Sequence, residues 1–488
     1  MKKTLKIYFT SDMHGYFSPI DYATGEYKDT GLVNCMMGFQ KDGNTLILDG
    51  GDTIQGSPFS TYVQNEVKDA SIFANVMNLA GYDYVTLGNH DLNYGKDYLK
   101  SYLNALDATC LCANIKDKDA ECNILSSDVR VMENGLKVGL IGVCTDYVRI
   151  WEKKENLDAF DVQDVKEALT AEVNKLRAEC DLLVGIYHGG FECDLATKEV
   201  LTDSRENIAY EICRDLPFDI LCTGHQHMSV ADENVCGTHL VQTPQHAAAY
   251  VKLEAVVEDG KVSVSSELCP AGSTSNEQAK EILAKTEQEV SVWLDTPKGH
   301  FDQPMLPDTK VNMALNGSPI ADFFNEIQLY FSKADISCTS LANDIKGFGK
   351  EVTIRDIVST YRYENTLVVL EVTGATLRQA LERCGEYFAV EDGVVKVSDA
   401  FLKPKVEHYN FDFYAGIDYA FDPERPVGKR VTFLRYQGKD VTDDQVFSLC
   451  MNNYRASGTG GYDMFKSCKV LREIQTDMVE LTINYLTR

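Results

Sequence analysis

The sequence predicts an α/β protein of two domains, a layered N-terminal domain followed by a smaller α+β domain. The chain has 488 residues, more than one ordinary domain holds. Over the first ~270 residues, apolar β-type runs alternate with helical patterns, which is typical of a layered α/β domain. This alternation stops at a polar helical segment near residues 274–295. A second, separately folded portion is therefore expected after it.

The expected strands of the first domain are short apolar runs, most of them rich in β-branched residues and several ending at a Gly, Asp or His. Their ranges are Leu5–Thr10, Thr45–Asp49, Tyr84–Leu87, Lys137–Val143, Leu182–Tyr187 and Ile220–Thr223. Helices are expected between them at Asp69–Ala80, Lys96–Leu106 and Asp164–Glu179.

We place the connection between the domains at residues 274–300. The segment Thr274–Asp295 has the pattern of a polar amphipathic helix, and Pro297 and Gly299 follow it. The first domain then spans residues 1–273 and the second spans residues 301–488, with helices expected near Pro319–Phe331 and Ala375–Arg383.

The charge balance excludes some partners. With 47 Lys and Arg against 74 Asp and Glu, the net charge is −27. Polymeric nucleic acid and anionic membranes need a basic face, so neither is an expected partner. No apolar run approaches the length of a membrane span, and no obligate protein partner is evident.

The cysteines and the first residues indicate the compartment. Fifteen cysteines are scattered without any C-x-x-C spacing, as in a reduced cytosolic protein. The opening apolar stretch, Leu5–Phe9, is too short for a secretory signal. We expect a cytoplasmic protein, or a secreted one if a leader has been removed from the sequence.

The most informative pattern is where Asp, His and Asn fall. Each lies at or just past the carboxyl end of an expected strand, where open α/β sheets build ligand sites. The residues are Asp12 and His14, Asp52, Asn89 and His90, His188, and His225 and His227. Carboxylate and amide oxygens mixed with imidazoles suit two divalent cations such as Mn²⁺, Zn²⁺, Co²⁺ or Fe²⁺. One such motif would be weak evidence, because a strand-end cap or a buried structural histidine explains it equally well.

The order D-x-H, G-D, G-N-H-D, a single His and G-H-x-H resembles that of the calcineurin-like dimetal phosphoesterases. With a second domain following, the chain is similar to the 5′-nucleotidase and 2′,3′-cyclic-nucleotide phosphodiesterase family. The resemblance implies a four-layer αββα first domain. It also implies that one metal is held by Asp12, His14 and His227, that the other is held by Asn89, His188 and His225, and that Asp52 bridges both.

The same resemblance implies the chemistry. A hydroxide shared by the two cations would attack phosphorus in line, while the metals stabilise charge on the phosphoryl oxygens. His90 is expected to stabilise the transition state or to protonate the leaving oxygen, and Asn89 to contact the substrate. A purely structural role behind the metal ligands is the alternative for His90.

One departure concerns the partner of that histidine. 5′-Nucleotidases usually read G-N-H-E-F-D, whereas this chain has Asn93 in place of the last carboxylate. Asn93 followed by Tyr94 and Gly95, together with DTIQGSP at 52–58, is similar to the cyclic-nucleotide branch. An amide does not raise the imidazole pKa as a carboxylate does, so we expect the acid role of His90 to weaken or change.

The second domain is expected to hold the nucleoside between two aromatic rings. Met451–Phe465 resembles the family's glycine-rich substrate loop, and Tyr462 is the expected stacking residue. Phe411 is the first choice for the second ring and Tyr409 the second choice. Asn343 lies where typical 5′-nucleotidases carry a substrate-binding arginine. These aromatic residues could instead be core residues.

The leading hypothesis is a dimetal 2′,3′-cyclic-nucleotide 2′-phosphodiesterase and 3′-nucleotidase acting on small nucleotides. The first alternative is a 5′-nucleotidase, with or without UDP-sugar hydrolase activity. A non-catalytic nucleotide-binding protein is a further alternative, and a nuclease on polymeric DNA is disfavoured by the acidic charge.

Overall fold

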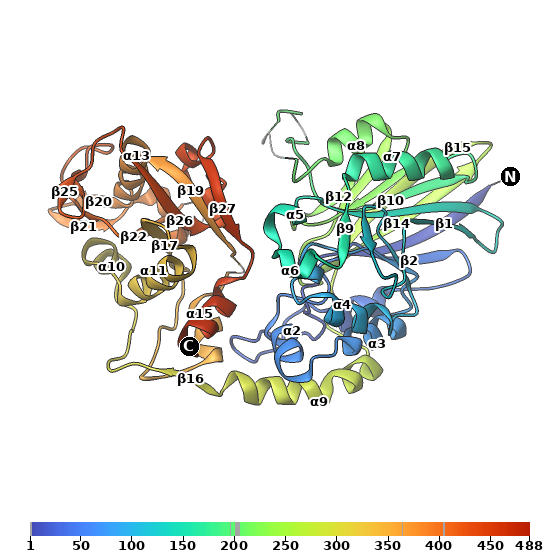
Figure 1. Ribbon diagram of the computed structural model, residues 1–488, viewed down its shortest axis with the longest axis horizontal. Coiled ribbons are helices and arrows are strands. Elements are labelled where there is room, and N and C mark those ends of the chain that lie inside the picture. Colours follow the sequence, from blue (N-terminus) through green and yellow to red (C-terminus); the bar gives the residue numbers. More distant parts are fainter. Residues whose placement is uncertain (1, 196, 201–204, 364, 404–405) are drawn as a thin grey trace. The chain divides into compact units, whose positions relative to one another are not determined.

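The computed structural model describes residues 2–195, 197–200, 205–363, 365–403 and 406–488. The chain forms two compact units (Figure 1). Unit 1 comprises Met1–Asp21 and Gly25–Ser291, and unit 2 comprises Tyr22–Thr24 and Val292–Arg488. The boundary at 291/292 falls inside helix α9 (Glu277–Leu294), within the segment where the sequence pattern changes.

Unit 1 contains two large mixed sheets. The seven-stranded sheet has the order β15 (Lys261–Pro270), β14 (Ala249–Glu258), β1 (Lys3–Thr10), β2 (Thr45–Asp49), β3 (Tyr84–Val85), β4 (Thr109–Leu111) and β6 (Ile124–Leu125). The six-stranded sheet has the order β12 (Val230–Val235), β13 (Thr238–Gln242), β11 (Ile220–Thr223), β10 (Leu182–His188), β8 (Lys137–Cys144) and β7 (Ser127–Val131). A small pair joins β5 (Ile115–Asp117) and β9 (Phe160–Val162).

The two sheets pack face to face around one apolar core. Ile7 and Leu48 from the first sheet meet Leu140 and Val184 from the second in this core. Alternate strand residues point to opposite faces, so neighbours such as Ile141 join a different core on the outer side. Strands buried on both faces explain why the sequence runs are almost continuously apolar.

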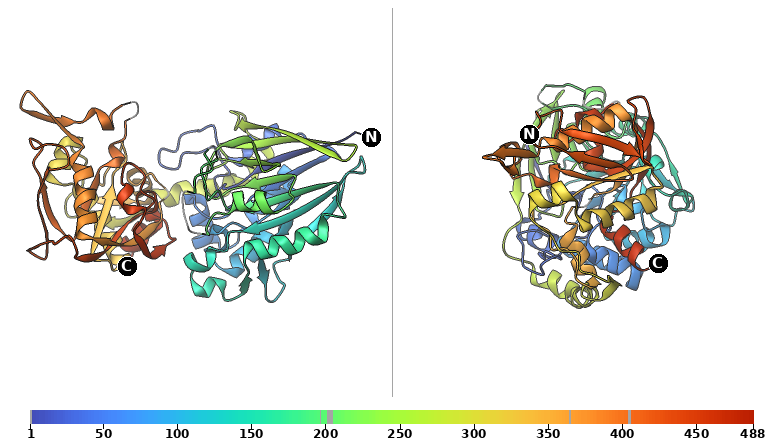
Figure 2. Two further views of the ribbon diagram at one scale, coloured as in Figure 1. Left: turned by 90° about the horizontal axis from the view of Figure 1, so that it is seen from above. Right: turned by 90° about the vertical axis from the view of Figure 1, so that its left-hand side faces the viewer.

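Helices cover the outer faces and complete four layers. Helices α7 (Val165–Leu176) and α8 (Ala209–Asp215) bury apolar residues against the outer face of the six-stranded sheet. Helices α3 (Ser71–Ala80) and α4 (Lys96–Leu103) lie beyond the other sheet (Figure 1). In the left view of Figure 2, the β14–β15 hairpin and α7 lie on opposite sides of unit 1. The shorter helices are α1 (Leu32–Cys35), α2 (Pro58–Tyr62), α5 (Val148–Trp151) and α6 (Lys154–Leu157).

Unit 2 is built on a five-stranded sheet of order β22 (Asp412–Ala415), β17 (Ile336–Ser340), β26 (Val446–Asn452), β19 (Leu367–Thr373) and β27 (Lys469–Ile474). Its helices are α10 (Lys310–Asn316), α11 (Pro319–Ser332), α12 (Ile354–Thr360), α13 (Gly374–Gly385), α14 (Asn453–Ala456) and α15 (Met478–Leu486). Smaller sheets pair β16 (Pro297–His300) with β18 (Glu351–Thr353), β20 (Phe388–Glu391) with β21 (Val394–Val397), and β24 (Val431–Tyr436) with β23 (Asp418–Phe421) and β25 (Lys439–Asp440).

The four-layer α/β domain and the α+β domain confirm the predicted fold class. The expected third strand, Tyr84–Leu87, pairs only over Tyr84–Val85, because the chain turns there into the loop that carries Asn89. No helix among the described residues is long and apolar enough to cross a bilayer.

Candidate dimetal site

The carboxyl ends of β1, β2, β10 and β11 bring six predicted ligands into two groups. Asp12, His14 and His227 form one, and Asp52, His188 and His225 form the other; within each group the ligand atoms lie within 4.8 Å of one another. Backbone hydrogen bonds join the loops after β1 and β2, from Asp12 N to Gly51 O (2.9 Å) and from His14 N to Asp52 O (2.8 Å). Side chains far apart in the sequence therefore meet at one edge of the sheets.

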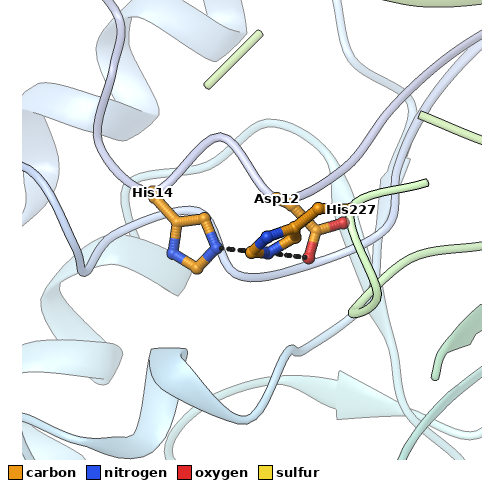
Figure 3. A group of neighbouring side chains, drawn as sticks. All are labelled: Asp12, His14 and His227. Atoms are coloured by element: carbon orange, nitrogen blue, oxygen red, sulfur yellow. Dashed lines mark hydrogen bonds and ion pairs between the residues drawn. The ribbon is translucent and has the colours of Figure 1, made fainter. Parts of the chain in front are cut away.

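In the first group, three potential ligands converge (Figure 3). The Nε2 atom of His227 lies 3.1 Å from His14 Nε2 and 3.4 Å from Asp12 Oδ1. His14 Nδ1 donates to the carbonyl of Gln55 at 3.0 Å, which leaves the Nε2 lone pair directed into the group.

In the second group, a nitrogen lone pair faces two oxygen acceptors. His188 Nδ1 donates to the carbonyl of Gly50 at 2.7 Å, so its Nε2 carries a lone pair in the neutral ring. That Nε2 lies 3.1 Å from Asp52 Oδ2 and 3.2 Å from Asn89 Oδ1. Three acceptors gathered around one point, with the fourth predicted residue His225 beside them, fit a bound divalent cation.

Asp52 belongs to the second group and also lies close to the first. Its Oδ2 atom is 3.1 Å from His188 Nε2 and 3.9 Å from His14 Nε2, so one carboxylate faces an imidazole of each group. A Cβ added at Gly88 would lie 2.1 Å from Asp52 Oδ1, so glycine is needed there for the Asn89 loop to approach. The bridging role that the family resemblance implies for Asp52 requires a carboxylate near both groups, and it stays a prediction.

Backbone strain marks the same residues. Asp12, His14, Asp52, His225 and His227 all have positive φ, between 49° and 71°. Left-handed backbone is uncommon for residues other than glycine, although Asn, Asp and His adopt it more often than most, and such positions cluster at active sites. Five of the seven predicted ligands therefore hold a backbone conformation that is uncommon for residues other than glycine.

The electrostatics of the site favour positive charge. Burial alone lowers the pKa of His188, but the neighbouring carboxylates of Asp52 and Asp12 outweigh it and raise this pKa to about 10. For Asp12, burial raises the pKa, yet the hydrogen bond to His227 and the nearby histidines lower it to about 2. Both shifts indicate a buried anionic cluster that stabilises cations.

His90 lies at the rim of the ligand groups. Its ring centroid is 5.4 Å from that of His14, and its backbone N donates to Asp52 Oδ1 at 2.7 Å. The Nδ1 atom lies 2.7 Å from Asn93 Oδ1, and Asn93 Nδ2 in turn donates to Glu152 Oε2. The carboxylate of Glu152 thus contacts the end of the Asn93 amide that faces away from His90.

The sequence reasoning missed three acidic residues around the site. The Asp91 carboxylate accepts from the backbone N of Asp52, Thr53, Ile54 and Gly88 at 2.8–3.1 Å and so ties two ligand loops together. Glu206 Oε1 lies 2.9 Å from His225 Nε2. The position of Asp91 beside His90 could have suggested its role, whereas nothing in the local sequence singles out Glu152 or Glu206.

In unit 2, the expected stacking role of Tyr462 is wrong for this structure. The ring is 0% exposed, stacks on Phe465 at 5.8 Å and covers the guanidinium of Arg455 at 4.0 Å. Its hydroxyl donates to the carbonyl of Asn410 at 3.0 Å. A side chain held in the core on every side has no free face for a base.

Phe411 and Asn343 are also held within the protein. Phe411 is 3% exposed and packs on Tyr387 and Phe413, with ring centroids 5.0 Å away in both cases. Asn343 donates to the carbonyl of Val406 at 2.8 Å and accepts from the backbone N of His408 at 3.0 Å. The side chain of Asn343 therefore fixes the loop before Tyr409, and its expected contact with the substrate stays a prediction.

Three other tyrosines form a partly exposed cluster on unit 2. Tyr409 lies between Tyr363 and Tyr454, with ring centroids 6.0 Å and 6.4 Å away. Tyr363 and Tyr454 are each 38% exposed. We call Tyr363, Tyr409 and Tyr454 the tyrosine cluster. The cluster includes Tyr409, the second candidate from the sequence for the base-stacking ring, and its rings are partly exposed to solvent.

Comparison with known proteins agrees with this architecture. The family model described as "Calcineurin-like phosphoesterase" matches residues 5–229, and "5'-nucleotidase, C-terminal domain" matches residues 299–467. A solved Staphylococcus aureus structure, of a protein assigned as a 5′-nucleotidase, is 32% identical with a TM-score of 0.73, covering 100% of this chain and 97% of that one.

Two curated relatives are similar over nearly the whole chain. The trifunctional nucleotide phosphoesterase YfkN of Bacillus subtilis is 26% identical over 99% of this chain, which spans only 38% of that protein's length. The 2′,3′-cyclic-nucleotide 2′-phosphodiesterase/3′-nucleotidase of Haemophilus influenzae is 25% identical, covering 98% of this chain and 84% of that protein.

Proposed function

Because the chain belongs to the calcineurin-like phosphoesterases that carry a 5′-nucleotidase C-terminal domain, we propose that it releases phosphate from small nucleotides. Membership makes it a metal-dependent phosphoric ester hydrolase. Within this class we favour a 2′,3′-cyclic-nucleotide 2′-phosphodiesterase with 3′-nucleotidase activity. The observation that carries the proposal is the pair of ligand groups, with the Asp52 carboxylate of the second group near an imidazole of each.

The donor set supports two divalent cations. Asp12, His14 and His227 would hold one cation, with His188, His225 and Asn89 holding the other and Asp52 shared. Imidazole-rich ligand sets favour Mn²⁺, Zn²⁺, Co²⁺ or Fe²⁺ over Mg²⁺. When bound, such a pair supplies Lewis acidity at the phosphoryl oxygens and an activated water nucleophile.

The chain's own side chains would complete the chemistry. With His90 Nδ1 engaged by Asn93, the opposite ring nitrogen, Nε2, is the one available to the leaving oxygen. The backbone N of the same residue holds Asp52 Oδ1, so His90 both orients the shared carboxylate and assists departure of the ester oxygen.

Two observations favour the cyclic-nucleotide branch. Asn93 stands where 5′-nucleotidases usually carry a carboxylate. Three curated relatives, from Haemophilus influenzae, Yersinia enterocolitica and Salmonella typhimurium, bear the phosphodiesterase/3′-nucleotidase name and align over 93–98% of this chain.

For base binding we propose the tyrosine cluster in place of Phe411 and Tyr462. Aromatic faces stack on any base, at about 1–3 kcal/mol per base, and they need exposure to do so. Such stacking selects small nucleotides without reading their identity. We propose no polymeric nucleic acid and no obligate protein as partners, since the net charge is −27.

The deciding experiment compares phosphate release from 3′-AMP, 5′-AMP and 2′,3′-cyclic AMP in the presence of Mn²⁺. Brisk turnover of the cyclic and 3′ substrates is expected. Turnover of 5′-AMP alone would instead support the 5′-nucleotidase alternative, which the Staphylococcus aureus relative favours. Binding of all three nucleotides without turnover would support a non-catalytic nucleotide-binding protein.

A further inference from the structure

A chain of hydrogen bonds connects His90 to an acidic residue far away in the sequence. His90 Nδ1 lies 2.7 Å from Asn93 Oδ1, and Asn93 Nδ2 donates to Glu152 Oε2, 59 residues further along the chain. Glu152 follows helix α5 directly. No metal ligand takes part in these contacts.

The two ends of the Asn93 amide are distinguished by this carboxylate. An ionised carboxylate only accepts hydrogen bonds, so the NH₂ group of Asn93 must face Glu152. The amide oxygen must then face His90, and the nitrogen that meets it, Nδ1, must carry hydrogen. Through the side chain of Asn93, the charge on Glu152 therefore determines which ring nitrogen of His90 carries hydrogen.

Glu152 is itself fixed by its second oxygen. Oε1 accepts from Asn156 Nδ2 at 2.8 Å and from the backbone N of Lys153 at 2.7 Å. Asn156 Nδ2 also donates to the backbone carbonyl of Asn93 at 2.9 Å. With Oε1 occupied by two donors, Oε2 is the atom presented to Asn93.

We infer that Glu152 is a positioning residue for the proposed reaction: acting through Asn93, it keeps hydrogen on Nδ1 of His90 and so presents Nε2 to the substrate. The inference rests on the proposed role of His90. With Nδ1–H directed at the Asn93 oxygen, Nε2 is the ring nitrogen that faces the leaving oxygen. The carboxylate that the sequence lacks at position 93 acts from position 152.

The geometry predicts the effect of Glu152→Gln. The two donors at Oε1 will retain the glutamine oxygen, so its NH₂ group will face Asn93. Asn93 must then rotate and turn its own NH₂ group toward His90, where Nδ1 becomes the acceptor and hydrogen moves to Nε2. The substitution is isosteric, yet it inverts the tautomer.

The test is ¹⁵N NMR of the imidazole nitrogens in Zn²⁺-loaded, histidine-labelled protein, with His90 assigned by a His90→Gln variant and measured while neutral. We expect Nδ1–H in the wild type and Nε2–H in Glu152→Gln. Glu155→Gln removes the same charge at an exposed site three residues on and should leave the tautomer unchanged. A wild-type Nε2–H form, or no change in Glu152→Gln, would overturn the inference.

The double variant Asn93→Asp/Glu152→Gln exchanges the carboxylate and the amide. The aspartate introduced at position 93 can accept directly from His90 Nδ1, while the NH₂ group of the glutamine introduced at position 152 donates to that aspartate. The Nδ1–H form should therefore return. Because this variant keeps the net charge and the hydrogen bonds, it tests the inference even where Glu152→Gln folds poorly. An Nε2–H form in the double variant would contradict it.

Activity gives a second readout. Glu152→Gln should lower kcat on 3′-AMP by roughly 10- to 100-fold with little change in KM, as other indirect contacts do. Hydrolysis of p-nitrophenyl phosphate, whose leaving group departs without protonation, should fall much less. An equal fall on both substrates would indicate damage to the metal site and refute the positioning role. Failure to hydrolyse any nucleotide would sink the proposed function while leaving the NMR result intact.

Discussion

The Nε2 atom of His188 lies 3.1 Å from the Oδ2 atom of Asp52, and both side chains are buried. The opposite ring nitrogen of His188 donates to a backbone carbonyl, so a lone pair is directed at a carboxylate. Two electron-rich groups at this distance are stable only with a cation between them, either a proton or a metal ion.

Removing the metals should therefore abolish activity. EDTA treatment followed by desalting is expected to eliminate phosphate release, and Mn²⁺ or Co²⁺ should restore it better than Mg²⁺, since imidazole ligands disfavour magnesium. Titration of each metal into the apoprotein, followed by rate assays and metal analysis, checks this. Full activity after verified metal removal would exclude the dimetal site.

Asp52→Asn should lower kcat by at least ~100-fold and reduce the bound metal, because a neutral amide cannot offset two cations. Asp107→Asn, at an exposed position of the same unit, is the matched control and should change neither quantity. Metal content by mass spectrometry and the rate with 3′-AMP are the measurements. Undiminished hydrolysis in Asp52→Asn would show that the site lies elsewhere.

Tyr409→Ala and Tyr454→Ala should each raise KM by roughly 5- to 150-fold, with a smaller effect on kcat, if the tyrosine cluster stacks on the base. Tyr330→Ala, which removes another exposed ring of unit 2, should leave KM unchanged.

Tyr462→Ala should instead cost about 3–5 kcal/mol of stability, since its ring is in the core. Steady-state kinetics and urea unfolding separate the two outcomes.

Arg455→Met should destabilise unit 2 by about 3–5 kcal/mol. The guanidinium Nε lies 2.7 Å from Asp412 Oδ2, with both side chains buried, so the substitution leaves an unpaired buried carboxylate. Arg455 Nη2 also donates to the carbonyl of Tyr409 at 3.0 Å, so KM should rise as well. A variant with unchanged unfolding in urea would contradict the structural role of this pair.

Asp49 should make stability depend on pH. Burial raises its pKa to about 7, although Thr53, Thr10 and the backbone of Gly51 donate hydrogen bonds that lower it. A carboxyl with a raised native pKa stabilises the fold fully below about pH 4 and loses that contribution as pH rises through 7. Relative to the wild type, Asp49→Asn should therefore gain stability between pH 5 and pH 8. The control is Asp107→Asn, whose difference in unfolding midpoint from the wild type should not change with pH. The same difference between Asp49→Asn and the wild type at pH 5 and at pH 8 would refute this prediction.

The strand ends were predictable from the sequence because buried parallel strands require apolar runs, and Asp12, Asp52 and His188 lie where those runs finish. The metal-ligand pattern depends on this local order, so it too could be read from the sequence. The contact between Asn93 and Glu152 could not, because it joins segments 59 residues apart through a loop without periodicity.

The burial of the Tyr462 ring could not be predicted from the sequence, for a different reason. Its glycine-rich neighbourhood indicates a loop near a ligand, but exposure depends on what packs against the ring. The ring packs on the guanidinium of Arg455, which forms a buried ion pair with Asp412. The local sequence pattern singles out neither Arg455 nor Asp412. Tyr409, in contrast, is held by Arg455 through its backbone, which leaves its ring outside the core.

The positive φ values at Asp12, His14, Asp52, His225 and His227 have a consequence for how such a chain drifts. At a left-handed position, glycine relieves strain, so losing a histidine ligand there can make the apoprotein easier to fold. Copies freed from selection for catalysis should therefore accumulate glycine at His14, His225 and His227 before their cores decay. A homologue that has lost hydrolytic activity would be recognisable by glycines in these loops.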